Sequence, residues 1–144
     1  MNAATALDLL SRSLVVPATT EVRTMAEILV IDEDARMRRL LARILNGAGH
    51  TVHQATGGEA GLGLFHQVHP ALVITDIVMP DMEGIELIRK LREDAPTIPI
   101  LAISGGDHPL YLPAATGLGA TAALAKPFAG DELLSLVRRL LGTV

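Results

Sequence analysis

Strand-like segments alternate with segments of helical periodicity along most of this 144-residue chain. Four apolar runs and one alternating segment predict five strands, over residues 28–31, 50–55, 71–75, 98–103 and 122–125. Strands separated by helical segments of about 10–15 residues form βαβ units, which place the strands parallel in one sheet. Unbroken apolar strands are typical of a sheet that is covered on both faces. The sequence therefore predicts an α/β fold, with a doubly wound parallel sheet of about five strands flanked by helices.

Apolar residues between these strands recur every three or four positions, which is the spacing of one helix face. The pattern predicts four helices, over residues 37–45, 59–68, 85–91 and 133–141. Asp131 is expected to cap the last of them. Gly61 and Gly63 weaken the second by about 1 kcal/mol each relative to alanine. The segment 105–120 receives no firm assignment, because Pro113 would bend a long helix there.

Composition and charge restrict the partners of this chain. A formal net charge of −4 argues against a nucleic-acid surface, because neutralising phosphates needs an excess of Lys and Arg. The absence of cysteine excludes disulfides, zinc–thiolate sites and thiol catalysis, and it fits the cytoplasm. No apolar run approaches the roughly 20 residues of a membrane helix. We expect a cytoplasmic protein that binds neither nucleic acid nor membrane.

Residues 1–25 are expected to form an N-terminal extension, and residues 26–144 a single domain. Asp8 and Arg12 interrupt the apolar residues of the extension, so it does not resemble a signal peptide. Met25 begins a pattern that looks like a natural protein start. One interpretation is therefore a loosely held appendage or an over-long start assignment.

A second interpretation of the extension rests on its leucines. Leu7, Leu10 and Leu14 have helical spacing, and Pro17 would end such a helix. The segment would then be a short helix that docks on the domain or on a neighbouring copy. Both interpretations stay open at the level of the sequence.

Polar residues follow four of the predicted strands, at the point where each strand ends. The third strand is the start of ALVITDIVMPDMEG, in which a buried run stops on Asp76. Asp32-Glu33-Asp34 follow the first strand, Ser104 closes the fourth, and Lys126 closes the fifth. Ligands of doubly wound sheets bind at the carboxyl ends of the strands. The sequence therefore predicts that several acids, a hydroxyl and an amine converge on one edge.

Carboxylates held close together repel one another unless a cation lies between them. Mg²⁺ commonly takes one or two carboxylates, a carbonyl oxygen and waters. A further carboxylate can then attack phosphorus, while the metal and an ammonium neutralise the transferring oxygens. Each residue also has a simpler explanation, as a helix cap, a turn residue, a loop serine or a surface lysine. Their joint occurrence on separate strand ends favours a phosphoryl-acceptor site.

These residues resemble the receiver domain of two-component response regulators. ILVIDED resembles its opening strand and acidic pair, and LVITDIVMPDMEG its phosphoacceptor strand and loop. PILAISGG resembles the strand that ends in a hydroxyl, and ALAKPF the strand that carries the lysine. The four motifs occur in the family's order and span about residues 26–142. The resemblance implies a CheY-like, flavodoxin-like fold with strand order 2-1-3-4-5.

The resemblance also implies a role for each residue of the acceptor site. Asp76 would be phosphorylated by a histidine kinase or a phosphotransfer protein. Lys126 would pair with the phosphoryl oxygens, and the Lys126-Pro127 bond would be cis. Ser104 would hydrogen-bond the phosphoryl group and draw its loop inward. Such a domain is a signalling module and not an enzyme, apart from self-catalysed transfer and slow autodephosphorylation.

The implied cofactor is Mg²⁺. Glu33 would bind it directly, Asp32 mainly through a water, and Asp76 and the main-chain carbonyl of Val78 would complete the protein ligands. Glu33 stands where Asp is common in the family, so the metal geometry shifts slightly. The apolar Val78 side chain would not position an attacking water, which suggests a longer-lived phosphoryl group.

One departure concerns how phosphorylation is transmitted. Ala123 stands where the family usually has Tyr or Phe, a ring that turns inward as the hydroxyl moves. Its absence puts the usual readout in doubt. Tyr111, the chain's one tyrosine, could contribute to the same face.

The sequence therefore predicts a stand-alone receiver that signals through contact with a downstream protein, or else a fragment of a longer protein. One alternative is a haloacid-dehalogenase-type phosphohydrolase that uses Asp32, because Asp32 and Asp34 have the D-x-D spacing. Arg36 replaces the Thr or Val expected there, and a late acidic pair is missing. The other alternative is a degenerate receiver that acts as a binding module.

Further polar residues have a simpler interpretation. His66 and His69 have the spacing of a metal pair, but no third ligand lies nearby in the sequence, so surface histidines are expected. Arg36, Arg38 and Arg39 are expected on a solvated helix face.

Overall fold

The structure is a computed structural model that describes residues 25–77, 84–105, 111–117 and 119–142. It contains one five-stranded parallel sheet in the order β2-β1-β3-β4-β5, which confirms the predicted fold class and strand order. The strands are β1 Glu27–Ile31, β2 Thr51–Ala55, β3 Leu72–Asp76, β4 Ile100–Gly105 and β5 Ala122–Lys126. The helices are α2 Ala35–Gly47, α3 Gly58–Val68, α4 Gly84–Asp94, α5 Tyr111–Gly117 and α6 Gly130–Gly142. The expectations for residues 1–24 and for Val78 lie outside the described residues.

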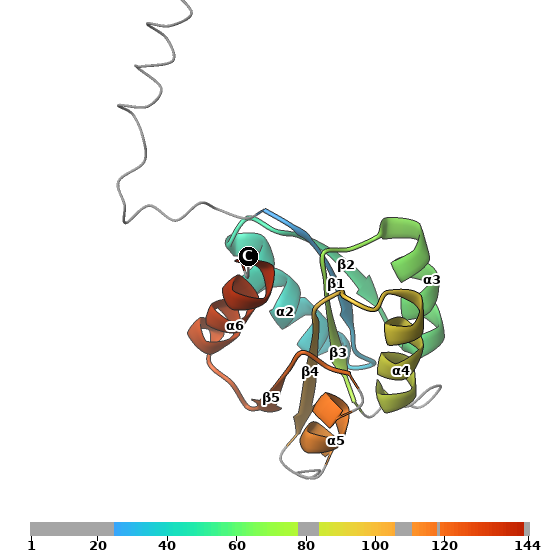
Figure 1. Cartoon of the computed structure of the whole chain (residues 1–144). Coiled ribbons are helices and arrows are strands. Elements are labelled where there is room, and N and C mark those ends of the chain that lie inside the picture. Colours follow the sequence, from blue (N-terminus) through green and yellow to red (C-terminus); the bar gives the residue numbers. More distant parts are fainter. Residues whose placement is uncertain (1–24, 78–83, 106–110, 118, 143–144) are drawn as a thin grey trace, which may run out of the picture.

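Helices cover both faces of the sheet, with α2 and α6 on one side and α3 and α4 on the other (Figure 1). Successive strand residues point to opposite faces, so each strand contributes to two cores. In β1, Ile28 and Val30 belong to the core that includes Leu41 of α2 and Val137 of α6. The alternate residue Leu29 belongs to the core that contains residues of α3 and α4.

The two glycines of α3 differ in what surrounds them. A Cβ atom on Gly61 would lie 2.9 Å from Cγ1 of Ile31 and still closer to its Cδ1, whereas a Cβ on Gly63 would meet nothing within 4 Å. Gly61 therefore lets α3 approach β1 closely, and it is buried. The helix forms despite both glycines because packing against the sheet outweighs their weak propensity.

Three boundaries differ from the sequence prediction, each for a local reason. The fourth strand begins at Ile100, because Ile98 N–H donates to Ala95 O in the turn after α4 and Pro99 has no N–H. Asp131 lies inside the first turn of α6 and is not its cap, although an acid there still complements the helix dipole. A short helix α5 fills part of the unassigned segment, with Pro113 in its first turn, where proline is tolerated.

No helix in the described ranges is long and apolar enough to cross a membrane. The strands all run in the same direction, so the sheet has one edge where strands begin and one where they end. The register pairs Asp76 with Ile103 and Gly105 with Lys126. The last residues of β3, β4 and β5 therefore lie next to one another at the carboxyl edge.

Candidate functional site

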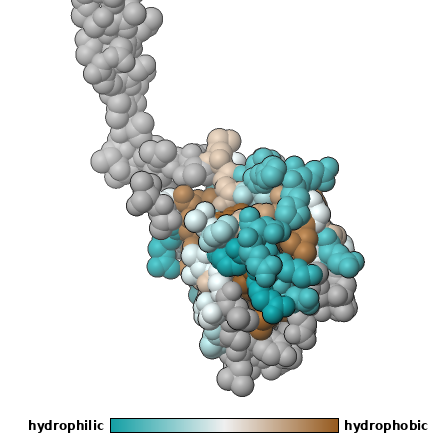
Figure 2. Space-filling model, turned by 45° about the vertical axis from the view of Figure 1, so that its right-hand side comes forward, coloured by the Kyte–Doolittle hydropathy of each residue, from teal (hydrophilic) through white to brown (hydrophobic). Residues whose placement is uncertain are grey.

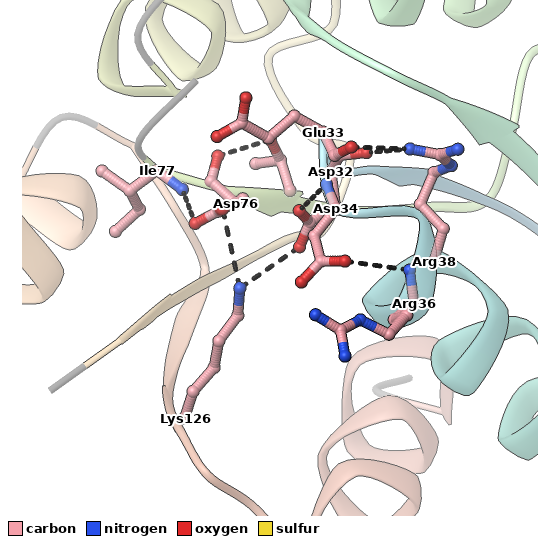
Figure 3. A network of polar contacts seen from close by, with 9 residues as sticks. Asp32, Glu33, Asp34, Arg36, Arg38, Asp76, Ile77 and Lys126 are labelled. Atoms are coloured by element: carbon pink, nitrogen blue, oxygen red, sulfur yellow. Dashed lines mark hydrogen bonds and ion pairs between the residues drawn. The ribbon is translucent and has the colours of Figure 1, made fainter. Parts of the chain in front are cut away.

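A lysine at the carboxyl edge lies between two carboxylates from other strand ends. Lys126 Nζ is 3.3 Å from Asp32 Oδ2 and 3.6 Å from Asp76 Oδ2 (Figure 3). The Asp32 side chain is 2 % exposed and that of Asp76 is 13 % exposed. A buried carboxylate is costly without a cation or hydrogen-bond donors, and Lys126 offers both acids the cation.

The main chain fixes the second oxygen of each acid. Asp34 N–H donates to Asp32 Oδ1 at 2.9 Å, and Ile77 N–H donates to Asp76 Oδ1 at 2.7 Å. In both residues Oδ2 faces Lys126. The two carboxylates are therefore oriented by the fold before any ligand arrives, which is the preorganisation that a reactive site needs.

Hydrogen bonds also fix the backbone around Asp76. Thr75 Oγ1 donates to Asp76 O at 2.9 Å, and Gly84 N–H donates to Ile77 O. A Cβ atom on Gly84 would overlap Asp76 O and the Cα of Ile77. Position 84 therefore requires glycine, because the start of α4 lies directly against the end of β3.

Arg38 supports the site, and the prediction of a solvated helix face is wrong for this residue. Its Nη1 donates to Asp32 O at 2.7 Å and to Glu33 O at 3.1 Å, so the guanidinium fastens the acidic loop to α2 (Figure 3). The side chain is half-buried. The only signal in the sequence is a basic residue one turn into the helix that follows an acidic loop, and many surface arginines share it. Arg36 and Arg39 are exposed, as expected.

Ser104 lies at the end of β4, between the strands that carry Asp76 and Lys126. It is 1 % exposed. Within the described part of the chain, its Oγ is the one buried side-chain polar atom without a hydrogen-bond partner. Buried hydroxyls in folded proteins are nearly always paired, so an unpaired one at a strand end marks a place where a ligand oxygen could bind.

The predicted metal ligands are only partly brought together. Asp32 and Asp76 share Lys126, whereas Glu33 is exposed and Val78 is outside the described residues. Among the residues that the structure describes, no three His, Asp or Glu side chains are grouped so that they could hold a metal by themselves. Mg²⁺ needs only one or two protein carboxylates and keeps several waters, so two hard oxygen donors at this edge fit it.

Asp34 has a structural role. Its side chain accepts from Arg36 N at 2.9 Å and caps α2, so the simpler explanation holds for this acid. The hydrogen bond from Arg36 N lowers the pKa of Asp34, because it stabilises the charged carboxylate. Asp34 is exposed and oriented towards its own helix, whereas Asp32 is oriented towards Lys126.

The two histidines lie on the outside of α3. His66 Nε2 is 3.1 Å from Asp94 Oδ2, and its side chain is 57 % exposed. His69 ends the helix in the left-handed conformation, with φ of 53°.

Ala123 pairs with Ala102 in the sheet and is half-buried. The side chain of Tyr111 is outside the described residues, and the Lys126-Pro127 bond is cis.

Comparison with known proteins gives consistent matches. A family model described as the response regulator receiver domain matches residues 28–138. The response regulator MprA of Mycolicibacterium vanbaalenii is 38 % identical over 114 residues, which is 79 % of this chain and 49 % of MprA. The chain thus spans about half the length of that relative.

Solved structures of response regulators have the same fold as this chain. The chemotaxis response regulator CheY4 of Vibrio cholerae has a TM-score of 0.75 at 30 % identity, covering 82 % of this chain and 100 % of that one. The receiver domain of NtrX from Brucella abortus has a TM-score of 0.78 at 30 % identity, covering 81 % of this chain and 99 % of that one.

Proposed function

The chain belongs to the receiver domain family of two-component response regulators, and from this premise we propose that Asp76 accepts a phosphoryl group from a phosphohistidine. The donor would be a histidine kinase or a phosphotransfer protein. The observation that carries the proposal is the position of Lys126 Nζ between the Oδ2 atoms of Asp32 and Asp76. It supplies a positive charge beside the acceptor carboxylate, where the oxygens of an incoming phosphoryl group would lie.

In the proposed step, a carboxylate oxygen of Asp76 forms a bond to phosphorus. The bond between phosphorus and the donor imidazole nitrogen breaks, and its electron pair returns to that nitrogen. The Lys126 ammonium pairs with the phosphoryl oxygens as they change position. The Ser104 hydroxyl donates to one of these oxygens, which gives its buried Oγ the partner it lacks within the described residues.

Asp32, Glu33, Asp76 and the main-chain carbonyl of Val78 would hold Mg²⁺. When bound, the ion supplies positive charge that offsets the negative charge gathered by the phosphoryl group and the acids. Lys126 lies between the two oriented carboxylates, and Arg38 fastens the acidic loop to α2.

Phosphorylation would bias an equilibrium between two surface conformations, and a downstream protein would bind one of them. Ala123 provides no aromatic ring for the usual readout, so the change would pass through the Ser104 loop and β5. The apolar residue Val78 favours a long-lived phosphoryl group. We place this activity in the cytoplasm, without nucleic acid or membrane as a partner.

The direct test is incubation with Mg²⁺ and acetyl phosphate, followed by mass measurement. The wild type should gain one alkali-labile phosphoryl group, and Asp76→Asn should gain none. Asp34→Asn is the matched control, because it changes a neighbouring acid that lies outside the acceptor pair, and it should still be labelled. Label that persists in Asp76→Asn would contradict the proposal.

The same experiment separates the two alternatives. Label on Asp32 would support a haloacid-dehalogenase-type hydrolase, and no Mg²⁺-dependent label would support a degenerate receiver. The geometry favours the acceptor reading, because Asp34, the second acid of the D-x-D pair, caps α2 through its hydrogen bond with Arg36 N.

A further inference from the structure

A cavity of about 580 Å³ opens at the edge where the strands begin, opposite the Asp76 site. Its lining comes from the residues that precede β1, β3 and β4 and from the last turn of α6. The apolar part of this lining consists of Met25, Ala26, Ala71, Pro99, Leu140 and Leu141. The cavity is separate from the acceptor site and has no part in the proposed phosphoryl transfer.

The lining of the cavity is about half apolar, and exposed Glu27, His69 and Thr97 supply its polar part. Met25 is 73 % exposed, and in the described ranges Leu40 is the other large exposed apolar residue, at 42 %. Leu140 and Leu141 are only half-buried, although they pack against the core beneath α2 and α6. Apolar surface appears beside the point where the described chain begins, whereas the face of α3 and α4 is largely hydrophilic (Figure 2).

The segment best placed to cover this cavity belongs to the same chain. Residues 1–24 are joined to Met25, which itself lines the cavity. Residues 17–24 form an eight-residue connection that can span about 26 Å when extended. That reach lets the preceding residues fold back on the edge from which the chain leaves. A tethered segment has an effective concentration on the order of millimolar, so even weak apolar contacts would keep it bound.

The sequence of this segment has the required pattern. Leu7, Leu10 and Leu14 recur at the spacing of one helix face, and Asp8 and Arg12 fall on the other side at the spacing of a favourable i, i+4 pair. The other side also carries Leu9 and Val16, so the charged residues occupy only part of it. A helix with an apolar stripe of this kind can lie in a groove along that stripe.

We propose that residues 5–16 dock in cis on the cavity between the strand starts and the end of α6, with Leu7, Leu10 and Leu14 facing Met25, Leu140 and Leu141. The docked segment covers the edge of the sheet that lies farthest from Asp76. The occupant is this segment and not a second copy, because the connection to Met25 holds it at the cavity mouth at any protein concentration.

Hydrogen exchange of the full chain, followed by mass spectrometry, tests the docking. Amides of residues 5–16 should exchange about ten-fold more slowly than those of an unstructured chain. Leu10→Glu should abolish this protection and also speed exchange at Leu140 and Leu141. Leu9→Glu, which makes the same change on the other side of the helix from the leucine stripe, should preserve both.

A second pair of variants changes exposed residues of the domain, so that the cavity is tested without a loss of core packing. Met25→Ser should lower the protection of residues 5–16, and Leu40→Ser, the matched change at the other exposed apolar residue, should leave it intact. Unprotected amides in the wild type would overturn the proposal, as would protection that survives both Leu10→Glu and Met25→Ser. Protection that depends on protein concentration would overturn the docking in cis.

Discussion

Two basic side chains hold opposite edges of the same sheet, and their partners differ. Lys126, where the strands end, lies between the carboxylates of Asp32 and Asp76. Arg92, where β4 and β5 begin, donates to the main-chain carbonyls of Ala95 and Gly119. An ammonium between two acids remains able to pair with a further anion, whereas a guanidinium fork filled by carbonyls only ties segments together. One edge keeps a cation between two acids, and the other ties segments of the chain together.

The Arg92 contacts extend further into the sheet. Its Nη2 lies 3.3 Å from Thr121 Oγ1, which also accepts from Ile100 N at 3.0 Å. Partial burial lowers the pKa of Arg92, because desolvation disfavours its charge, although an arginine stays protonated in proteins. The end of α4 is thereby fastened to the starts of two strands.

The largest expected effect is on phosphoryl transfer, from Lys126→Met. We expect the rate of labelling by acetyl phosphate to fall about 100-fold, because the variant removes the charge beside the transferring oxygens. The control is Lys90→Met at the chain's other lysine, which is paired on the surface with Glu86 and should be labelled normally. Equal labelling of the wild type and Lys126→Met would contradict the proposal that Lys126 assists phosphoryl transfer at this edge.

The next effect is on stability, from Arg92→Met. The free energy of unfolding should fall by about 2 kcal/mol, because two carbonyls and a hydroxyl lose a charged donor, while labelling of Asp76 is unchanged. Urea denaturation measures the first and mass spectrometry the second. Arg89→Met, at an exposed position of the same helix, should change neither. A labelling defect in Arg92→Met that exceeds its stability defect would contradict the conclusion that Arg92 only ties segments of the chain together.

A smaller effect, in two opposite directions, is expected from Ser104→Ala. Labelling should slow by about ten-fold, because a phosphoryl oxygen loses its donor. Stability should rise by about 1 kcal/mol, because a buried hydroxyl without a partner is removed. Ser104→Thr keeps the hydroxyl and should retain the labelling rate. A loss of stability in Ser104→Ala would mean that this hydroxyl serves the fold and not the site.

The smallest effect concerns pH at the edge where the strands begin. Burial lowers the pKa of His50 below its ordinary 6.5, and its Nδ1 accepts from Ala26 N. The unfolded chain therefore takes up this proton first on acidification. The His50 contribution to stability is complete above pH 6.5 and declines as the pH falls towards the folded-state pKa.

His50→Asn keeps an acceptor atom but cannot titrate. Denaturation at pH 7.5 and 5.5 should show a smaller loss of unfolding free energy in this variant than in the wild type. Labelling of Asp76 at the opposite edge should be the same for both proteins at either pH. Identical pH dependence of stability in the two proteins would contradict the role of His50.

Much of the fold can be predicted from the sequence, because apolar strands and helical stripes are local patterns. The positions of Asp32, Asp76 and Lys126 can also be predicted. Parallel strands end at one edge of the sheet, and the sequence shows which residue stands at the end of each apolar run. The structure places these three together as that reasoning expects. What the three residues do at that edge stays a prediction until labelling is measured.

Other features depend on contacts that no local pattern encodes. Gly61 and Gly63 look alike in the sequence, yet only Gly61 lies against Ile31. Arg38 sits on the polar face of its helix like its neighbours, but its long side chain folds back to the carbonyls of Asp32 and Glu33. Long side chains and close backbone approaches depend on tertiary distance, which spacing along the chain does not give.

The hydrogen bond between Gly84 and Ile77 has a practical consequence for protein engineering. It joins the residue after β3 to the first residue of α4, and a Cβ atom at position 84 would overlap Asp76 O. A side chain at position 84 would therefore displace the backbone of Asp76 together with the start of α4. Anyone redesigning α4 should keep Gly84 unchanged.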